Sequence, residues 1–186
     1  MNQKDMVLEF AKKNNGIIKT DELKEYNINR STIKGIIEKI NRSLYITADT
    51  FEDEYYSLQN KCPKAIFSHE TALYFHDLTD RTPIKLMVTI PSDSNSRYVK
   101  DERYELGKIK VKTPYGNFVY CYDMERTICD IVRNKEKIER FQYVDALKRY
   151  AKLNTRNSKK LYNYAKKFKI EKELQNYMKK KIFIIF

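Results

Sequence analysis

The sequence predicts an α+β fold, with an N-terminal winged helix-turn-helix followed by a mixed α/β domain with a small sheet and a helical C-terminal end. Three observations carry this prediction. Apolar residues recur at helical spacing over much of the chain, and two β-prone runs flank the turn-forming residues 114–117. The first 50 residues follow the order helix, helix, turn, helix, hairpin. We therefore expect residues 1–50 to form one domain and residues 51–186 a second.

The first two predicted helices are short and have clear ends. Val7 and Ala11 mark the apolar face of a helix that ends near Gly16, a residue that can adopt the left-handed conformation. Thr20 is a good N-cap for a second helix over residues 21–26, and Leu23 faces the core from it.

A third helix is predicted over residues 30–40, because four isoleucines recur there at helical spacing: Ile33, Ile36, Ile37 and Ile40. In that helix Gly35 would face outward and cost about 1 kcal/mol relative to alanine. On a DNA-facing helix this glycine would let the backbone approach the groove; the alternative is a weak point in an exposed helix. Residues 41–43 then form a turn before the β-prone residues 44–47, as in a short wing.

The remaining elements alternate between helices and short strands. Ser68 and Asp123 are predicted helix N-caps. The most loop-like stretch is residues 92–96. We expect helices over residues 51–61, 141–152, 158–169 and from 171 onward, and strands over 85–90, 109–113 and 118–122.

The positive charge is concentrated at the C-terminal end. The chain carries a formal net charge of +12, and residues 131–186 hold 17 basic and 5 acidic side chains. A basic surface of this density is typical of contact with nucleic acid or another anionic partner. The alternative is a lysine-rich face that serves solubility.

Composition argues against several classes of protein. No run approaches about 18 consecutive apolar residues and no secretory leader is recognisable, so we expect a cytoplasmic protein without a membrane partner. Three cysteines without a CxxC pair disfavour a disulfide framework or a zinc site. The apolar end of the chain, after Lys181, is predicted to pack on the core or to mediate self-association.

Two segments resemble catalytic motifs, and we expect neither to act as one. Ser68, His69 and Glu70 are consecutive, so on a helix they point about 100° apart and do not form a relay. His69 and His76 lie about 10 Å apart along a helix, too far to share a metal alone. The acidic run at 123–126 is explained by a cap and by a structural pair of Glu125 with Arg126. We expect no catalytic residue, no metal and no cofactor, and hence no enzyme.

Three longer strings resemble a known family. They are FSHETALYFHDLTDRTP (67–83), VKTPYGNFVYCYDMERTICDIVR (111–133) and DALKRYAK (145–152), after the N-terminal GIIKTDELKEYNINRSTIKGII. Over nearly the whole chain the sequence is similar to the AbiEi antitoxins of type IV toxin–antitoxin and abortive-infection operons, which act in phage defence. The resemblance implies a winged helix that binds double-stranded operator DNA upstream of its own operon and represses transcription. It also implies a second domain that neutralises a nucleotidyltransferase-like toxin without a stable complex.

The resemblance places the recognition helix on residues 30–40 and the wing on residues 41–47. The wing is shorter than the family's basic hairpin and offers only one arginine, so the C-terminal lysines are expected to add backbone contacts. Arg30, Ser31, Thr32 and Lys34 are the predicted major-groove residues, with Arg30 or Lys34 on guanine, and the predicted phosphate contacts are Lys39, Arg42, Lys159, Lys160, Lys166 and Lys167.

Two other functions remain open from the sequence. One is an interaction protein that neutralises the toxin by direct binding, for which co-purification is the test. The other is an enzyme acting on the toxin or its RNA substrate, which would turn over at substoichiometric amounts. Self-association on DNA is also left open, because small helix-turn-helix units gain specificity by pairing on repeated half-sites.

Overall fold

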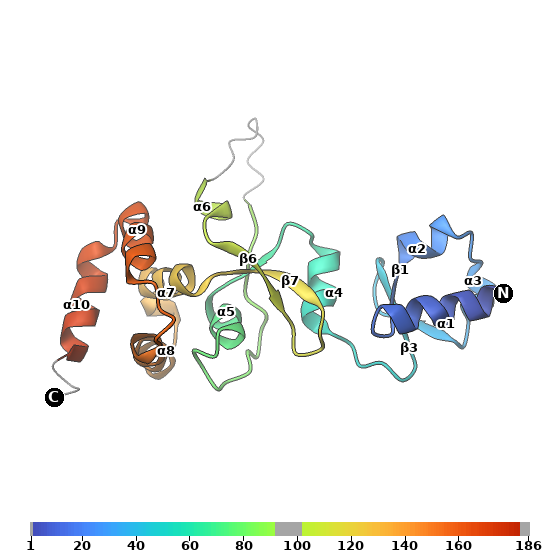
Figure 1. The fold of residues 1–186 in the computed structure, drawn as a ribbon, viewed down its shortest axis with the longest axis horizontal. Coiled ribbons are helices and arrows are strands. Elements are labelled where there is room, and N and C mark those ends of the chain that lie inside the picture. Colours follow the sequence, from blue (N-terminus) through green and yellow to red (C-terminus); the bar gives the residue numbers. More distant parts are fainter. Residues whose placement is uncertain (1, 92–101, 183–186) are drawn as a thin grey trace. The chain divides into compact units, whose positions relative to one another are not determined.

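A computed structural model describes residues 2–91 and 102–182 and has a mixed α+β fold (Figure 1). The chain divides into two compact units. The first consists of Met1–Lys64 with Lys112–Val119, and the second of Ala65–Val111 with Tyr120–Phe186. The domain boundary expected after residue 50 stays a prediction. The loop expected at 92–96 and the apolar residues 183–186 lie outside the described residues.

The first unit begins with two helices at the predicted places. Helix α1 (Gln3–Lys13) buries Val7 and Ala11, as predicted. Gly16 follows with φ +79°, and a Cβ there would collide with the side chain of Thr50, so only glycine fits. Strand β1 (Ile17–Lys19) leads into helix α2 (Thr20–Glu25), which begins at Thr20 itself rather than one residue later.

The predicted helix over residues 30–40 is wrong beyond its first turn. Helix α3 covers only Arg30–Ile33, after which Lys34 is extended and Gly35 has φ +82°. A positive φ ends a helix, and glycine adopts it without steric cost. Strand β2 (Ile37–Lys39) follows, so Gly35 is a turn residue rather than an outward-facing helix position.

The isoleucine spacing predicted one continuous helix, but a helical turn followed by a tight turn and a strand brings these isoleucines to the same apolar core. Ile33 from α3 and Ile37 from β2 are both buried in the same apolar cluster. The spacing of the isoleucines therefore reflects their burial in this cluster and not a helical conformation. The cluster contains Val7, Ala11, Ile18, Leu23, Ile28, Ile33, Ile37 and Tyr45.

A three-stranded antiparallel sheet completes this part of the chain. Strand β3 (Leu44–Thr47) confirms the predicted β-prone run and is the central strand, in the order β1-β3-β2. It pairs with β2 through Ile37 opposite Thr47 and Lys39 opposite Tyr45. All four residues of β3 are buried, which explains why this strand is the most apolar of the three.

Helix α4 (Glu54–Lys61) is tied to residues far along the chain through one carboxylate. Asp53 caps α4 by accepting the Tyr56 backbone N–H at 3.0 Å. Its second oxygen accepts the Thr113 hydroxyl at 2.6 Å and the Asn117 amide at 2.8 Å. Because Asp53 is only 3% exposed, these bonds replace the water that the carboxylate loses on burial.

A second small sheet has the strand order β5-β4-β7-β6 and belongs mainly to the second unit, while the turn end of its β6–β7 hairpin, residues 112–119, is counted with the first. Phe67 in β4 pairs in parallel with Cys121 in β7 and antiparallel with Val88 in β5. The predicted hairpin is confirmed, whereas the strand predicted over 85–90 is reduced to two residues. The strands are β4 (Ile66–Phe67), β5 (Val88–Thr89), β6 (Lys108–Lys112) and β7 (Phe118–Tyr122).

Helices form the rest of this unit, and α7 (Met124–Arg133) is buried most completely. Every residue from Glu125 to Val132 is buried. Asp123 caps α7 through the Arg126 N–H at 2.8 Å, as predicted. The other helices of this unit are α5 (His69–Phe75), α6 (Glu102–Glu105), the short 3-10 turn Lys135–Lys137, α8 (Arg140–Lys152), α9 (Ser158–Phe168) and α10 (Glu171–Ile182).

The charged side chain at the centre of this core is held by stacking and by an ion pair. The Arg126 guanidinium carbon lies 4.0 Å from the ring centroid of Tyr122 and 4.5 Å from that of Phe168. Its Nε lies 2.9 Å from Asp130 Oδ2. Burial raises the pKa of Asp130, and the neighbouring Arg126 opposes that rise.

Candidate nucleic-acid interface

The predicted DNA-contact residues of the first unit lie on α3 and on the β2–β3 hairpin. Ser31 and Lys34 are exposed. Thr32 is half-buried, and its hydroxyl donates to Gln3 Oε1 at 3.0 Å, which ties α3 to α1. The backbone of Arg30 begins α3, while its side chain lies outside the described part of the structure.

The turn of the β2–β3 hairpin is fixed while its arginine is exposed. The Thr20 hydroxyl donates to the Arg42 carbonyl at 2.9 Å, and the Thr20 N–H donates to the Ser43 carbonyl at 2.8 Å. Asn41 Oδ1 accepts the N–H of Ser43 at 2.8 Å. The Arg42 side chain therefore extends from a backbone held at the start of α2, which lowers the entropy cost of a contact made there.

Three of the four C-terminal lysines share one exposed side of α9. Lys159, Lys166 and Lys167 are exposed, at positions i, i+7 and i+8 of the helix. The opposite side is buried by Leu161 and Ala165, as predicted.

Lys160 has a different environment. Its Nζ lies 2.9 Å from Asp123 Oδ2 and 3.8 Å from Glu125 Oε2. Both carboxylates are buried, so Lys160 neutralises charge within the fold. The sequence did not indicate this pairing, because Asp123 and Lys160 are distant in the chain.

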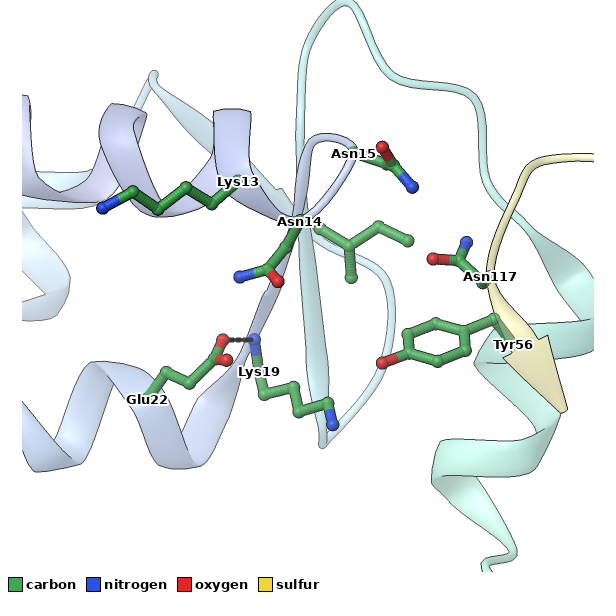
Figure 2. A pocket seen from close by; sticks show the side chains of 8 residues that line it. Lys13, Asn14, Asn15, Lys19, Glu22, Tyr56 and Asn117 are labelled. Atoms are coloured by element: carbon green, nitrogen blue, oxygen red, sulfur yellow. Dashed lines mark hydrogen bonds between the residues drawn. The ribbon is translucent and has the colours of Figure 1, made fainter.

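A polar hollow in the first unit involves residues that the sequence did not single out (Figure 2). It has a volume of about 170 Å³. The Lys19 ammonium lies 5.9 Å from the centroid of the Tyr56 ring. The backbone N–H of Lys19 donates to Glu22 Oε2 at 2.8 Å. Its lining comes from the end of α1, from β1, α2 and α4, and from the turn after β6: Lys13, Asn14, Asn15, Ile17, Lys19, Glu22, Tyr56 and Asn117.

Ser68 and His69 are in contact, contrary to the expectation that consecutive helical residues point apart. Ser68 Oγ lies 3.0 Å from His69 Nδ1, because His69 has φ +48° and is not in a regular helical conformation. Ser68 occupies the predicted N-cap position of α5, but its side chain makes no capping hydrogen bond.

The hydrogen bonds around His69 do not favour activation of Ser68. Asn134 Nδ2 donates to the Asp130 carbonyl at 2.9 Å and lies 3.1 Å from His69 Nε2. An amide nitrogen only donates, so Nε2 accepts and the ring proton is on Nδ1, toward Ser68. In this tautomer Nδ1 has no lone pair for the serine proton, and Ser68 is completely buried.

The acidic residues at 123–126 are also used within the fold. Glu125 Oε1 accepts the Asn157 N–H at 3.0 Å and the Tyr150 hydroxyl at 3.3 Å. The predicted pair of Glu125 with Arg126 is wrong, because Arg126 turns to Asp130. Burial raises the pKa of Tyr150, and the Glu125 charge adds to that rise.

Within the described ranges, no three His, Cys, Asp or Glu side chains come together as a metal site would require. Two of the cysteines are buried, and burial raises the pKa of Cys129 to about 12. A thiol with that pKa stays protonated near neutral pH and is a poor nucleophile.

Among residues 2–91 and 102–182, no helix combines the length and the apolar composition needed to cross a membrane. Comparison with protein-family models and with curated proteins finds no match to this chain.

Proposed function

We propose that this chain is a DNA-binding repressor of its own operon and the antitoxin of a type IV toxin–antitoxin system, acting in the cytoplasm. The observation that carries the DNA-binding part is the order α1-β1-α2-α3-β2-β3 with a β1-β3-β2 sheet. Helices α2 and α3 are separated by residues 26–29, a connection of the length found in helix-turn-helix units. The winged helix-turn-helix assignment is part of this proposal.

The short α3 changes the DNA contact that we propose. A single helical turn places few side chains in the major groove, so we expect the β2–β3 hairpin to make more of the DNA contacts. Ser31 and Lys34 would approach base edges, while Lys39 and Arg42 would bind flanking phosphates. Arg30, the first residue of α3, remains a candidate for guanine contact.

The antitoxin part is supported by the resemblance of the three sequence strings. The functional partner would be a nucleotidyltransferase-like toxin, neutralised without a stable complex. Direct binding of that toxin is the alternative, and stable co-purification of the two proteins would favour it.

The first test is fluorescence-anisotropy binding of the full chain to the DNA upstream of its own gene and to a scrambled duplex, at several salt concentrations. We expect a large preference for the upstream DNA with a steep salt dependence. Equal and weak binding to both duplexes would contradict sequence-specific repression.

Matched variants locate the contact. Lys34→Ala is expected to weaken operator binding by about 1–3 kcal/mol if the lysine reads a base, and to reduce the preference over scrambled DNA. Lys61→Ala, which removes an exposed lysine at the end of α4, is the control and should leave the preference unchanged. If the two variants behave alike, Lys34 makes no base contact.

A further inference from the structure

One face of the β6–β7 hairpin carries lysines and aromatic rings that the proposed operator contact does not use. Hydrogen bonds at both ends fix the register: Asp123 N–H to the Gly107 carbonyl and Thr113 N–H to the Asn117 carbonyl, each 2.7 Å. Residues directly opposite in an antiparallel pair point to the same side. This register places Lys112 opposite Phe118 and Lys110 opposite Tyr120.

The lysine at the base of the hairpin, Lys108, already has partners within the fold. Lys108 Nζ lies 3.2 Å from Glu105 Oε2 and 4.5 Å from the centroid of the Tyr120 ring. This lysine is therefore already used within the fold, as a salt bridge and as a cation over an aromatic ring.

The end of the hairpin near the turn is different. Lys110 and Lys112 are exposed, and across the described residues no acidic side chain forms an ion pair with either. The Lys110 ammonium lies 5.8 Å from the centroid of the Tyr120 ring, so its charge is not neutralised by that contact. Phe118 is 62% exposed and Tyr115 in the turn is 49% exposed. Asp53 anchors this turn through Thr113 and Asn117, so the two rings stand on a fixed backbone.

Lysines on an edge strand have a simpler explanation, since they discourage pairing with the edge of another sheet. β6 is an edge strand, and this accounts for Lys110 and Lys112. It does not account for the exposed rings of Phe118, on the neighbouring strand β7, and of Tyr115, in the turn. Exposed rings add apolar surface and do nothing to discourage edge pairing.

We propose that the turn-side half of this hairpin binds single-stranded polynucleotide, with bases stacking on Phe118 and Tyr115 and phosphates contacting Lys110 and Lys112. Exposed aromatic rings next to cationic side chains are the elements of a sequence-tolerant single-strand surface. A duplex fits this surface less well, because its base faces are already stacked inside the helix. The site is separate in chemistry from the operator contact on α3 and the β2–β3 hairpin.

The test measures anisotropy of fluorescein-labelled oligouridylate and oligodeoxythymidylate of about twelve nucleotides, a length within the range bound by known single-strand folds. The full chain should bind these oligonucleotides more tightly than a mixed-sequence duplex of equal length. The double variant Tyr115→Ala/Phe118→Ala should bind them about tenfold or more weakly, because two bases no longer stack. A preference for oligouridylate would identify RNA, and the reverse would identify single-stranded DNA.

Further variants separate stacking from charge. Lys110→Ala/Lys112→Ala should flatten the dependence of log K on log salt by about 1.4, because each single-strand phosphate that a lysine neutralises contributes about 0.7. Phe118→Tyr should retain binding and Phe118→Leu should lose it, because only the aromatic ring stacks. The control is Phe141→Ala, which removes a ring that is 66% exposed on α8.

Unchanged oligonucleotide affinity in the Tyr115→Ala/Phe118→Ala variant overturns the proposal and leaves the lysines as protection of a sheet edge. Operator binding is measured in parallel and should be unaffected by this variant. The unmodified chain could fail to bind its operator while the Tyr115→Ala/Phe118→Ala variant still loses oligonucleotide affinity. That result would contradict the proposed function and support this inference.

Discussion

Asp53 illustrates how single polar residues stabilise this chain, because one buried carboxylate joins three segments. It caps α4, accepts the Thr113 hydroxyl and accepts the Asn117 amide. Asp123 does the same in the second unit, with the Arg126 N–H, the Tyr164 hydroxyl and Lys160 as partners. Removing one partner of such a group leaves a buried charge uncompensated, which costs several times the net value of the bond.

Tyr122 makes the stability of the second unit depend on pH. Burial raises its pKa to about 12, and its hydroxyl donates to the Tyr104 carbonyl at 2.9 Å. Between pH 10 and about 12 the unfolded chain loses the phenol proton that the folded chain keeps. The folded state then binds more protons, so the free energy of unfolding falls as the pH rises.

We expect urea midpoints to fall over this alkaline range, with at most about 3 kcal/mol attributable to Tyr122. Tyr122→Phe should lose about 1 kcal/mol at neutral pH and show a smaller alkaline decline. An identical decline in both proteins would mean that Tyr122 ionises as readily in the fold as in the unfolded chain.

Among the helices and strands, the segment from α3 to β2 is the clearest departure from the prediction. One positive φ at Gly35 divides a run of isoleucines into one helical turn and a strand. The sheet decides the outcome, because β2 pairs with the buried central strand β3 and gains its hydrogen bonds there. Local helix propensity does not include those distant partners.

Gly35→Ala distinguishes the two conformations by the sign of its effect. In a helix, alanine would stabilise the chain by about 1 kcal/mol. At φ +82° it should instead destabilise by about 1–2 kcal/mol, although no atom lies within 4 Å of the added Cβ. Gly35→Asn should lose less, since asparagine tolerates this conformation. Urea denaturation gives the answer, and a more stable alanine variant would restore the helical interpretation.

Across the full chain, the distribution of charge matters more than its sum. The net charge is +12, and residues 131–186, with 17 basic and 5 acidic side chains, carry an excess equal to the whole of it. Part of it is used internally, as the ion pair of Lys160 with Asp123 shows. Lys159, Lys166 and Lys167 are exposed together on one side of α9, which makes them candidates for contact with an external partner.

If these three lysines contact operator phosphates, the variant Lys159→Ala/Lys166→Ala/Lys167→Ala should bind operator and scrambled duplexes more weakly by similar factors. The slope of log K against log salt should flatten by about 0.9 for each duplex phosphate that is no longer neutralised. Lys137→Ala/Lys148→Ala/Lys152→Ala removes the same charge from other exposed positions and is the control. Equal changes in the two variants would indicate a general charge effect.

Elements with local signals could be predicted from the amino-acid sequence without reference to the rest of the fold. Two β-prone runs on either side of the turn-forming residues 114–117 predicted the β6–β7 hairpin. A capping aspartate predicted the start of α7, and apolar spacing predicted α1, α8 and α9. These features depend on neighbours within one or two turns, which a sequence contains directly. The basic face of α9 was predictable for the same reason.

In contrast, tertiary packing decides which polar residues are paired inside the fold and which stay exposed for function. The pairing of Lys160 with Asp123 and the anchoring of the β6–β7 turn by Asp53 each depend on groups far apart in the chain. Burial gives such contacts their strength, because a polar group removed from water must find a partner wherever the fold places one. Sequence patterns predict where a helix or strand can form, whereas packing determines which charges remain exposed.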